Sequence, residues 1–300
     1  MHTSLPQIVC GSDEEFHKPW SPKIVSLLSK RCSVLLIGCG NMGSAIALAL
    51  NGLMANLSLT VVDSDEDKAR KLLGGQLDTR IVGDSLALGA EQFDVCVVAV
   101  KPGDAVEALF SARANLQSSL IISIAAGTSL ASLRQGAAVN SRLVRVMPNL
   151  AAIVRKAISV GYADGAISSE DQEFVEVGFG AVGHFHWLRS ENEIDVATAI
   201  TGSGPGYVFS FAQHLQEAAE QIGFSKETAD RFARQVIVGA AGLLDEDPRS
   251  SLELKHAVAS PGGTTAAGLA VFEQAAAMPR IIGQTIAAAA RAKELAMERD

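Results

Sequence analysis

The stretch that decides the fold begins with Val34-Leu35-Leu36-Ile37 and continues as Gly38-Cys39-Gly40-Asn41-Met42-Gly43. Four consecutive aliphatic residues are typical of a strand that is buried on both faces of a sheet. The glycine-rich segment that follows predicts a tight turn that opens a helix running to about Asn51. A strand, a Gly-x-Gly-x-x-Gly turn and a helix in this order are the fingerprint of a dinucleotide-binding unit.

Each glycine of this fingerprint has its own physical task. Gly38 permits the tight turn, Gly40 lets the backbone approach a pyrophosphate, and Gly43 allows close packing between helix and strand. The start of the helix offers free N–H groups and the positive end of its dipole to the phosphates. We therefore expect the cofactor to be bound by the six residues of the fingerprint: Gly38, Cys39, Gly40, Asn41, Met42 and Gly43. The alternative is a glycine-rich turn with no ligand.

The type of dinucleotide depends on Asp63, which ends the next predicted strand, 20 residues after Gly43. A carboxylate in this place accepts hydrogen bonds from the ribose hydroxyls of NADH and repels the additional phosphate of NADPH. We expect Asp63 and Ser64 to contact the cofactor, with a preference for NADH over NADPH. Two alternatives stay open: Asp63 could cap the following helix, or it could turn away and leave Ser64, Lys68 and Arg70 to bind a phosphate.

Downstream of this unit, apolar strands alternate with helical segments. Strand patterns cover residues 57–62, 94–100, 120–124 and 143–147, and helical patterns cover residues 65–73 and 129–135. Strands that alternate with helices over this length form a parallel, doubly wound sheet. The predicted fold class is therefore α/β, with a Rossmann-like sheet in a dinucleotide-binding domain of residues 31–189.

Two further strand ends lie where a cofactor would bind, because ligands of such sheets sit outside the carboxyl ends of the strands. The residues expected to contact the cofactor there are Ala99, Val100, Lys101 and Pro102 after the third strand, and Ala125 and Ala126 after the fourth. The small side chains of the second segment let a flat nicotinamide approach the backbone. Lys101 suits a ribose, a phosphate or a substrate anion, although a solvated lysine at a strand end fits the pattern equally well.

After residue 190 the spacing of apolar residues changes from that of strands to that of helices, and the helical spacing continues from there. Apolar residues recur on one helical face, as in Val208, Phe211, Leu215 and Ile222. The last segment, 281–297, is an Ala-rich helix of a kind that packs closely against a second subunit. We expect an all-α domain over residues 190–300 that packs against a second subunit.

Composition limits the classes of function. The chain has 300 residues, a net charge of −8 and only 5% aromatic residues. The negative charge argues against nucleic acid as a partner, and no apolar run reaches the length of a transmembrane helix. The four cysteines lack metal-ligand spacing, so we expect no metal site and a reducing, cytoplasmic location. We expect residues 1–30 to be an N-terminal extension rather than a secretory signal.

Two glycine-rich motifs in the helical half carry more polar groups than capping alone requires. The first is Thr201-Gly202-Ser203-Gly204-Pro205-Gly206-Tyr207, which places a proline at the start of a helix. The second, Ser260-Pro261-Gly262-Gly263-Thr264-Thr265, opens a helix with unpaired N–H groups and hydroxyls. Such a turn suits a small anion, and the residues expected to bind a substrate carboxylate are Ser260, Gly263, Thr264 and Thr265. The alternative is ordinary helix capping.

Both motifs, together with Ala99-Val100-Lys101-Pro102 and Arg145-Val146-Met147-Pro148-Asn149, resemble segments of the pyrroline-5-carboxylate reductase family. The resemblance covers about residues 33–275, with the motifs in the same order. It implies a reductase that uses NADPH or NADH to convert the cyclic imine 1-pyrroline-5-carboxylate to L-proline, the last step of proline biosynthesis. It also implies that residues 190–300 are a substrate and dimerisation domain that interlocks with its twin in a homodimer, or in a higher oligomer of dimers. Asp63 is unusual for the members of the family that prefer NADPH.

The resemblance also assigns roles to particular residues. It implies that Thr264 and Thr265 hold the substrate carboxylate, with Asn149 as a further substrate contact. Glu191 matches an acidic position of the family near the ring nitrogen, where its charge would support the protonated imine that accepts the hydride. Ser203, Thr265 or a water would relay a proton. Glu191 is equally compatible with a first-turn glutamate that favours a helix N-terminus.

Other functions fit the same architecture. A β-hydroxyacid dehydrogenase would carry a catalytic lysine in the helix after the glycine-rich turn, and residues 205–222 contain none. A reductase of a related cyclic imine would use the same motifs. A non-catalytic dinucleotide sensor would have little need for the Ser-Pro-Gly-Gly motif.

Overall fold

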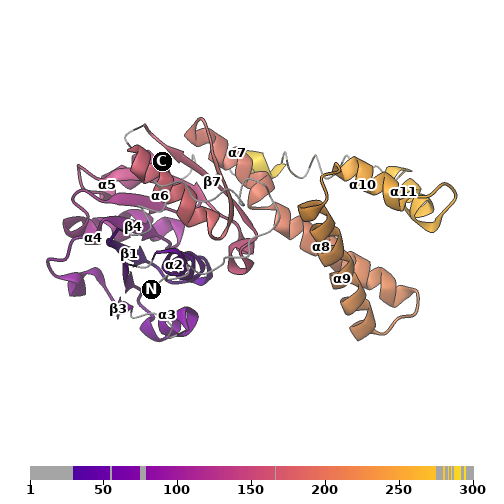
Figure 1. The fold of residues 1–300 in the computed structure, drawn as a ribbon, viewed down its shortest axis with the longest axis horizontal. Coiled ribbons are helices and arrows are strands. Elements are labelled where there is room, and N and C mark those ends of the chain that lie inside the picture. Colours follow the sequence, from indigo (N-terminus) through magenta and orange to yellow (C-terminus); the bar gives the residue numbers. More distant parts are fainter. Residues whose placement is uncertain are drawn as a thin grey trace, which may run out of the picture. The chain divides into compact units, whose positions relative to one another are not determined.

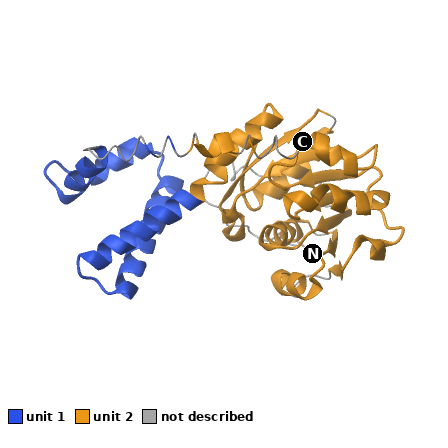
Figure 2. Cartoon of the chain, turned by 180° about the vertical axis from the view of Figure 1, so that it is seen from behind, with its two compact units in different colours: residues 1–21, 206–284 blue, residues 22–205, 285–300 orange. Residues whose placement is uncertain are grey.

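A computed structural model of the chain describes residues 30–54, 56–74, 79–165 and 167–274, and parts of the segment 280–294. The predicted extension 1–30 and the predicted last helix 281–297 lie largely outside the described residues. The chain divides into two compact units, one containing residues 22–205 and the other residues 206–284 (Figure 2). Each unit is described below by itself.

The first unit is built around an eight-stranded sheet with the strand order β3-β2-β1-β4-β5-β6-β7-β8 (Figure 1). The strands are β1 Cys32–Ile37, β2 Leu57–Val62, β3 Arg80–Val82, β4 Val95–Val98, β5 Leu120–Ser123, β6 Arg142–Met147, β7 Ala157–Ala163 and β8 Gly183–Trp187. Neighbouring strands are parallel except β6 and β7, which are antiparallel. The order of the first six strands is that of a dinucleotide-binding Rossmann sheet, so the predicted fold class is confirmed.

The helices of this unit follow the strands along the chain. They are α2 Asn41–Leu53, α3 Glu66–Leu73, α4 Ala105–Ala112, α5 Leu130–Gly136, α6 Ser169–Gly180 and α7 Glu191–Thr201, with short 3-10 turns η1 Ser85–Leu88, η2 Pro102–Asp104, η3 Arg113–Asn115 and η4 Leu150–Val154.

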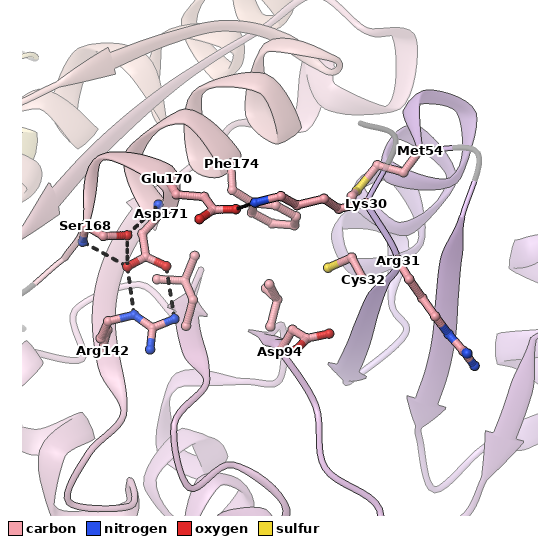
Figure 3. Close-up of a pocket in the computed structure, with 12 residues that line it drawn as sticks. Lys30, Arg31, Cys32, Met54, Asp94, Arg142, Ser168, Glu170, Asp171 and Phe174 are labelled. Carbon is pink, nitrogen blue, oxygen red and sulfur yellow. Dashed lines mark hydrogen bonds and ion pairs between the residues drawn. The ribbon is translucent and has the colours of Figure 1, made fainter. Parts of the chain in front are cut away.

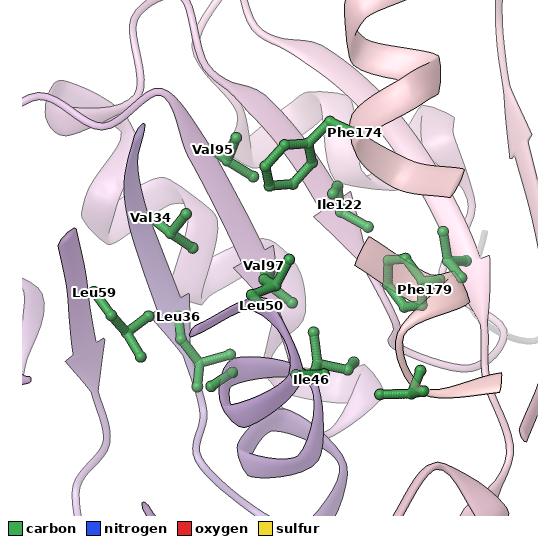
Figure 4. Close-up of a cluster of buried hydrophobic side chains, with 14 of the residues drawn as sticks. Val34, Leu36, Ile46, Leu50, Leu59, Val95, Val97, Ile122, Phe174 and Phe179 are labelled. Carbon is green, nitrogen blue, oxygen red and sulfur yellow. The ribbon is translucent and has the colours of Figure 1, made fainter. Parts of the chain in front are cut away.

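The sheet has a buried core on each side, because successive residues of a strand point to opposite faces. On one side, Val34 and Leu36 of β1 share a cluster with Phe174 and other residues of α2 and α6 (Figure 4). On the other side, Leu35 shares a cluster with Leu109 of α4 and residues of α5. The core is mostly aliphatic, as the low aromatic content requires, and it fixes the carboxyl ends of the strands at which a site is expected.

Helix α7 packs on β6 and β7 and therefore belongs with the sheet. Its residues Ile194 and Ala199 are buried. The two units divide after Pro205, whereas the change in hydrophobic period suggests a boundary between residues 189 and 190. The two positions differ because the change to a helical period marks only where the helices begin. A helix that packs on the sheet, such as α7, has the same 3.6-residue period as the helices of the second unit.

The second unit consists of helices α8 Gly204–Gln221, which begins at the end of the first unit, α9 Lys226–Glu246, α10 Ser251–Val258 and α11 Thr264–Gln274. Within the described residues, α8 and α10 bury no side chain and α9 buries only Ala229 and Ala233. Large apolar side chains are exposed instead: Val208, Phe209, Phe211, Phe232, Val236, Leu243 and Val258. An apolar surface of this extent on a single chain is typical of an interface with another subunit.

Among the helices of the described segments, none is both long and apolar enough to cross a lipid bilayer.

Candidate active site

The glycine-rich loop has the close contacts that its sequence predicts. Gly38 has a φ of +90°, and a Cβ on it would lie 2.8 Å from the backbone of Ala99. A Cβ on Gly43 would overlap the carbonyl oxygen of Gly38, so α2 can approach the end of β1 only without a side chain there. Gly40 differs from both, because a Cβ on it would meet no atom within 4 Å. Gly40 therefore faces open space, as a residue that approaches a ligand must.

The N-terminus of α2 is free to bind an anion. Its N-cap is Gly40, which has no side chain to accept a hydrogen bond, and the first turn contains no acidic residue. The N–H groups of Asn41, Met42 and Gly43 lie in this first turn, where an α-helix provides no backbone acceptor. Uncapped N–H groups at the positive end of a helix dipole suit the pyrophosphate of a dinucleotide, so the residues present fit the predicted cofactor.

Asp63 follows β2 and is tied to the glycine-rich loop. Its Oδ2 accepts a hydrogen bond from the N–H of Cys39 at 2.6 Å, and its Oδ1 accepts one from the N–H of Asp65 at 2.9 Å. The cap of α3 is Asp65, whose side chain accepts from the N–H of Lys68, so Asp63 is not the helix cap. The carboxylate of Asp63 therefore points towards the predicted cofactor loop and does not turn away from it, while Ser64 and Lys68 are exposed beside it.

The ends of β4 and β5 lie at the same edge of the sheet as the glycine-rich loop, since β1, β4 and β5 are parallel neighbours. The Ala99 N–H donates to the carbonyl of Ile37 at 2.8 Å. The Thr128 hydroxyl donates to the carbonyl of Pro102 at 3.4 Å and so joins the two loops. The predicted cofactor residues differ in exposure: Ala125 is buried, Ala99, Val100, Pro102 and Ala126 are half-buried, and Lys101 is exposed. The structure thus brings all the predicted cofactor residues to one edge.

Glu191, at the start of α7, makes contacts that its sequence position does not reveal. Its Oε1 accepts a hydrogen bond from the N–H of Leu130 at 2.7 Å and lies 3.2 Å from Nη1 of Arg145. Nη2 of Arg145 lies 2.6 Å from Oδ1 of Asp195, one turn further along α7. The Arg145 side chain is only 4% exposed, against 26% for Glu191 and 12% for Asp195. Glu191 is therefore part of a partly buried ion cluster that joins α7 to β6 and α5.

Arg145 and Asp195 are the members of this cluster whose roles the sequence analysis missed. Arg145 is a charge in the interior of β6, between Val144 and Val146, and Asp195 lies four residues after Glu191 on the same helix. A charge within a buried strand requires a partner, and an acidic pair at i and i+4 offers one. These two signals together could have indicated the contact.

Asn149 connects the segment after β6 to the far end of α7. Its Nδ2 donates to the carbonyl of Thr201 at 2.8 Å, and its Oδ1 accepts from the N–H of Ala151 at 3.1 Å. Ser203 lies in the turn after α7, where its N–H donates to the carbonyl of Thr198 at 2.9 Å. Glu191 thus begins α7 and Ser203 follows its end, and the 11-residue helix is about 16 Å long at 1.5 Å per residue. The structure does not bring these two predicted catalytic residues together.

The Ser-Pro-Gly-Gly motif forms a turn that opens α11 in the second unit. Gly262 has a φ of +72°, and the N–H of Gly263 donates to the carbonyl of Ser260 at 3.0 Å. A Cβ on Gly263 would lie 2.5 Å from the hydroxyl oxygen of Ser260, so a larger residue here would require the Ser260 side chain to move. Thr264 and Thr265 begin the helix and are exposed. The four predicted carboxylate-binding residues therefore lie in one local turn, in which Ser260, Thr264 and Thr265 are exposed.

A pocket lies at the opposite edge of the sheet, at the amino ends of β1, β4, β5 and β6 (Figure 3). Four of the charges that line it form two pairs: Arg142 donates to both carboxylate oxygens of Asp171, and Lys30 pairs with Glu170. Since ligands of such sheets bind at the carboxyl ends of strands, this pocket is not the expected cofactor site. No cluster of metal-ligating side chains occurs within the described part of the chain.

Comparisons with known proteins agree with both halves of this arrangement. Residues 191–295 match a family described as pyrroline-5-carboxylate reductase dimerisation, and residues 33–127 match a family described as NADP oxidoreductase, coenzyme F420-dependent. A pyrroline-5-carboxylate reductase of Pseudomonas aeruginosa is 34% identical over 266 residues, which cover 88% of this chain and 96% of the relative.

Solved structures give the same result. A pyrroline-5-carboxylate reductase from Coxiella burnetii superposes with a TM-score of 0.78 at 33% identity, covering 89% of this chain and 99% of the other. A pyrroline carboxylate reductase from Plasmodium falciparum with NADP bound superposes with a TM-score of 0.74 at 27% identity, with the same coverage of 89% and 99%.

Proposed function

The chain belongs to the pyrroline-5-carboxylate reductase family, and we infer that it reduces 1-pyrroline-5-carboxylate to L-proline with a reduced nicotinamide dinucleotide. The observation that carries this inference is the uncapped N-terminus of α2 at Gly40, in a chain whose alignment covers 96% of a family member. The exposed Ser-Pro-Gly-Gly turn before α11 is a fitting place for a substrate carboxylate. This combination favours imine reduction over a β-hydroxyacid dehydrogenase or a dinucleotide sensor.

Different residues bind the cofactor and the substrate in the proposed reaction. The first-turn N–H groups of α2 hold the pyrophosphate, and the small residues Ala99, Ala125 and Ala126 leave room for the nicotinamide, which supplies a hydride when bound. Thr264 and Thr265 hold the substrate carboxylate. A protonated imine nitrogen makes the imine carbon electron-poor, so the hydride forms the new C–H bond while the C=N π pair becomes the nitrogen lone pair.

We propose that the chain prefers NADH to NADPH. The support for this preference is that both carboxylate oxygens of Asp63 accept backbone hydrogen bonds, which hold the charge beside the glycine-rich loop. A fixed carboxylate there can accept from the ribose hydroxyls and repels an additional phosphate. The relative of known structure that carries NADP differs in sequence at most positions, at 27% identity, and does not decide the preference of this chain.

We propose a homodimer, or a higher oligomer of dimers, formed through the exposed apolar side chains of α8 to α11. Support comes from the family described as dimerisation, which matches residues 191–295. We also propose a cytoplasmic location, which is supported by the free, buried thiols of Cys32, Cys39 and Cys96.

The test is the loss of reduced-nicotinamide absorbance on addition of 1-pyrroline-5-carboxylate, measured in parallel with NADH and NADPH and with proline identified as the product. Thr265→Val removes one hydroxyl at nearly constant volume and is expected to raise KM for the imine without changing NADH binding. Thr228→Val, which alters a hydroxyl at the start of α9, is the matched control. Cofactor binding without turnover in either assay would contradict the proposed activity.

A further inference from the structure

The most unusual charge of the sheet unit is Arg145, which lies in the middle of β6 and is 3% exposed as a residue. Its neighbours in sequence, Val144 and Val146, belong to the core on one side of the sheet, so Arg145 projects to the other side, where α7 packs. A buried guanidinium is tolerated only when hydrogen-bonded charges compensate the loss of its hydration. Glu191 and Asp195 provide these charges from one face of α7.

The cluster extends from α7 to the loop after β5. Glu191 Oε1 accepts the N–H of Leu130, which is the first residue of α5. Ser129 caps α5, and the four residues before it, 125–128, form the loop that we expect to face the nicotinamide. Since Thr128 also donates to the carbonyl of Pro102, this loop is held on one side by the segment after β4 and on the other by Glu191.

We propose that Glu191 and Asp195, acting through Arg145, are positioning residues that hold the loop of residues 125–128 against the reduced nicotinamide. The proposal rests on the function inferred above, and it gives Glu191 a different role from that of an acid beside the substrate nitrogen. Glu191 Oε1 is occupied by Leu130 and Arg145, and both contacts depend on an acceptor oxygen at this position.

A glutamine at position 191 separates these two roles. Its carbonyl oxygen can accept from the Leu130 N–H and from Arg145 while the negative charge is removed. If Glu191 positions the loop, Glu191→Gln retains most of the NADH affinity and of kcat, and Glu191→Ala does not. If Glu191 acts on the substrate by its charge, both variants lose kcat equally.

The experiment compares Glu191→Gln, Glu191→Ala and Asp195→Asn with the wild type. The dissociation constant of NADH is measured by fluorescence titration, and kcat, KM and their pH profiles by imine reduction. We expect Glu191→Ala to weaken NADH binding about tenfold, the factor that corresponds to one lost charge-assisted hydrogen bond. Glu191→Gln and Asp195→Asn are expected to stay within about threefold of the wild type, with unchanged pH profiles.

Glu193→Ala is the matched control, because Glu193 lies in the same turn of α7 and accepts the N–H of Arg189 at 2.8 Å without reaching the sheet. It is expected to bind NADH as the wild type does. Unchanged NADH binding in Glu191→Ala would overturn the proposal, as would an equal loss of kcat in Glu191→Gln and Glu191→Ala. If the wild type fails to reduce the imine while Glu191→Ala still weakens NADH binding, the inferred substrate is wrong and the positioning role stands.

Discussion

The carboxylate of Asp63 accepts a hydrogen bond from the backbone N–H of Cys39, with 2.6 Å between Oδ2 and the nitrogen. The contact joins the end of β2 to the middle residue of the Gly-x-Gly turn, 24 positions earlier in the chain. Asp63 thereby holds the middle of the glycine-rich loop in place. Under the NADH preference proposed above, the same carboxylate also distinguishes the two cofactors, so loop order and cofactor preference would change together on its replacement.

Replacement of Asp63 by serine is expected to shift the ratio of kcat/KM for NADPH over NADH by about tenfold towards NADPH, because the repulsive charge is lost. The same substitution is expected to lower the free energy of unfolding by about 1 kcal/mol through loss of the Cys39 contact. Steady-state kinetics with both cofactors and urea denaturation measure the two effects. Asp67→Ser removes an equal charge from the exposed first turn of α3 and is expected to change neither the kcat/KM ratio nor the free energy of unfolding. An unchanged ratio in Asp63→Ser would contradict the assignment of preference to this residue.

Gly43→Ala and Gly40→Ala are expected to fail in different ways. A Cβ at position 43 would overlap the Gly38 carbonyl, and the required shift of α2 is expected to cost about 2 kcal/mol of folding stability. A Cβ at position 40 meets no protein atom, so the stability should change by less than about 1 kcal/mol. NADH binding should nevertheless weaken about tenfold in Gly40→Ala, since the new methyl group occupies the approach of the pyrophosphate. Thermal unfolding and NADH titration distinguish the two, and equal stability losses would refute this interpretation.

The ion pair between Arg142 and Asp171 is expected to make stability depend on pH in acid. Burial raises the pKa of the Asp171 carboxyl, but hydrogen bonds from Arg142 and Ser168 outweigh it, so the pKa lies below its ordinary value of 3.8. The folded protein therefore binds this proton less readily than the unfolded chain. The stability contributed by Asp171 is complete above pH 3.8 and is lost as the pH falls through the folded-state pKa.

Asp171→Asn should accordingly lower the free energy of unfolding by about 2 kcal/mol at pH 7, and the difference from the wild type should shrink below pH 3.8. Urea denaturation at a series of pH values measures this difference. The control is Glu170→Gln, whose partner Lys30 and own side chain are each 57% exposed, and which should cost less than about 0.5 kcal/mol. A difference that stays constant as the pH is lowered from neutral through 3.8 would show that Asp171 does not act by its charge.

The thiol of Cys39 is expected to be inert although it lies in the cofactor loop. Burial and, to a smaller extent, the neighbouring Asp63 carboxylate raise the pKa of the Cys39 thiol to about 11. Burial likewise raises the pKa of Cys32 to about 12, with Asp94 as the second cause. At neutral pH both remain thiols, which are poor nucleophiles. Iodoacetamide should leave both unmodified in the native protein and alkylate both in urea, as mass spectrometry of the peptides would reveal. Rapid labelling of Cys39 in the native state, with loss of NADH binding, would contradict the prediction that this thiol is inert.

Much of the sheet could be predicted because buried parallel strands are continuous apolar runs. The strands β1, β4 and β5 have this pattern, while β2 and β6 are mostly apolar runs interrupted by single polar residues, and all five were expected. Of the strands that were not expected, two have a clear physical reason. β3, Arg80–Val82, is a three-residue edge strand, too short to show a period. β7, Ala157–Ala163, contains Ser159, Gly161 and Tyr162 and runs antiparallel to β6, so its composition resembles that of a loop.

The sequence alone determined the α/β fold class, the glycine-rich loop and the family resemblance, because each depends on local periods or on short motifs in a fixed order. The strand order and the direction of the Asp63 side chain came from the structure. Only the tertiary structure decided what Glu191 contacts. Its partners Leu130 and Arg145 are 61 and 46 positions away. A carboxylate in the first turn of a helix can cap, pair or catalyse, and no local pattern distinguishes these roles. The packing of α7 onto β6 decides between these roles, because it buries the Arg145 guanidinium beside this side chain and so requires an acceptor oxygen there.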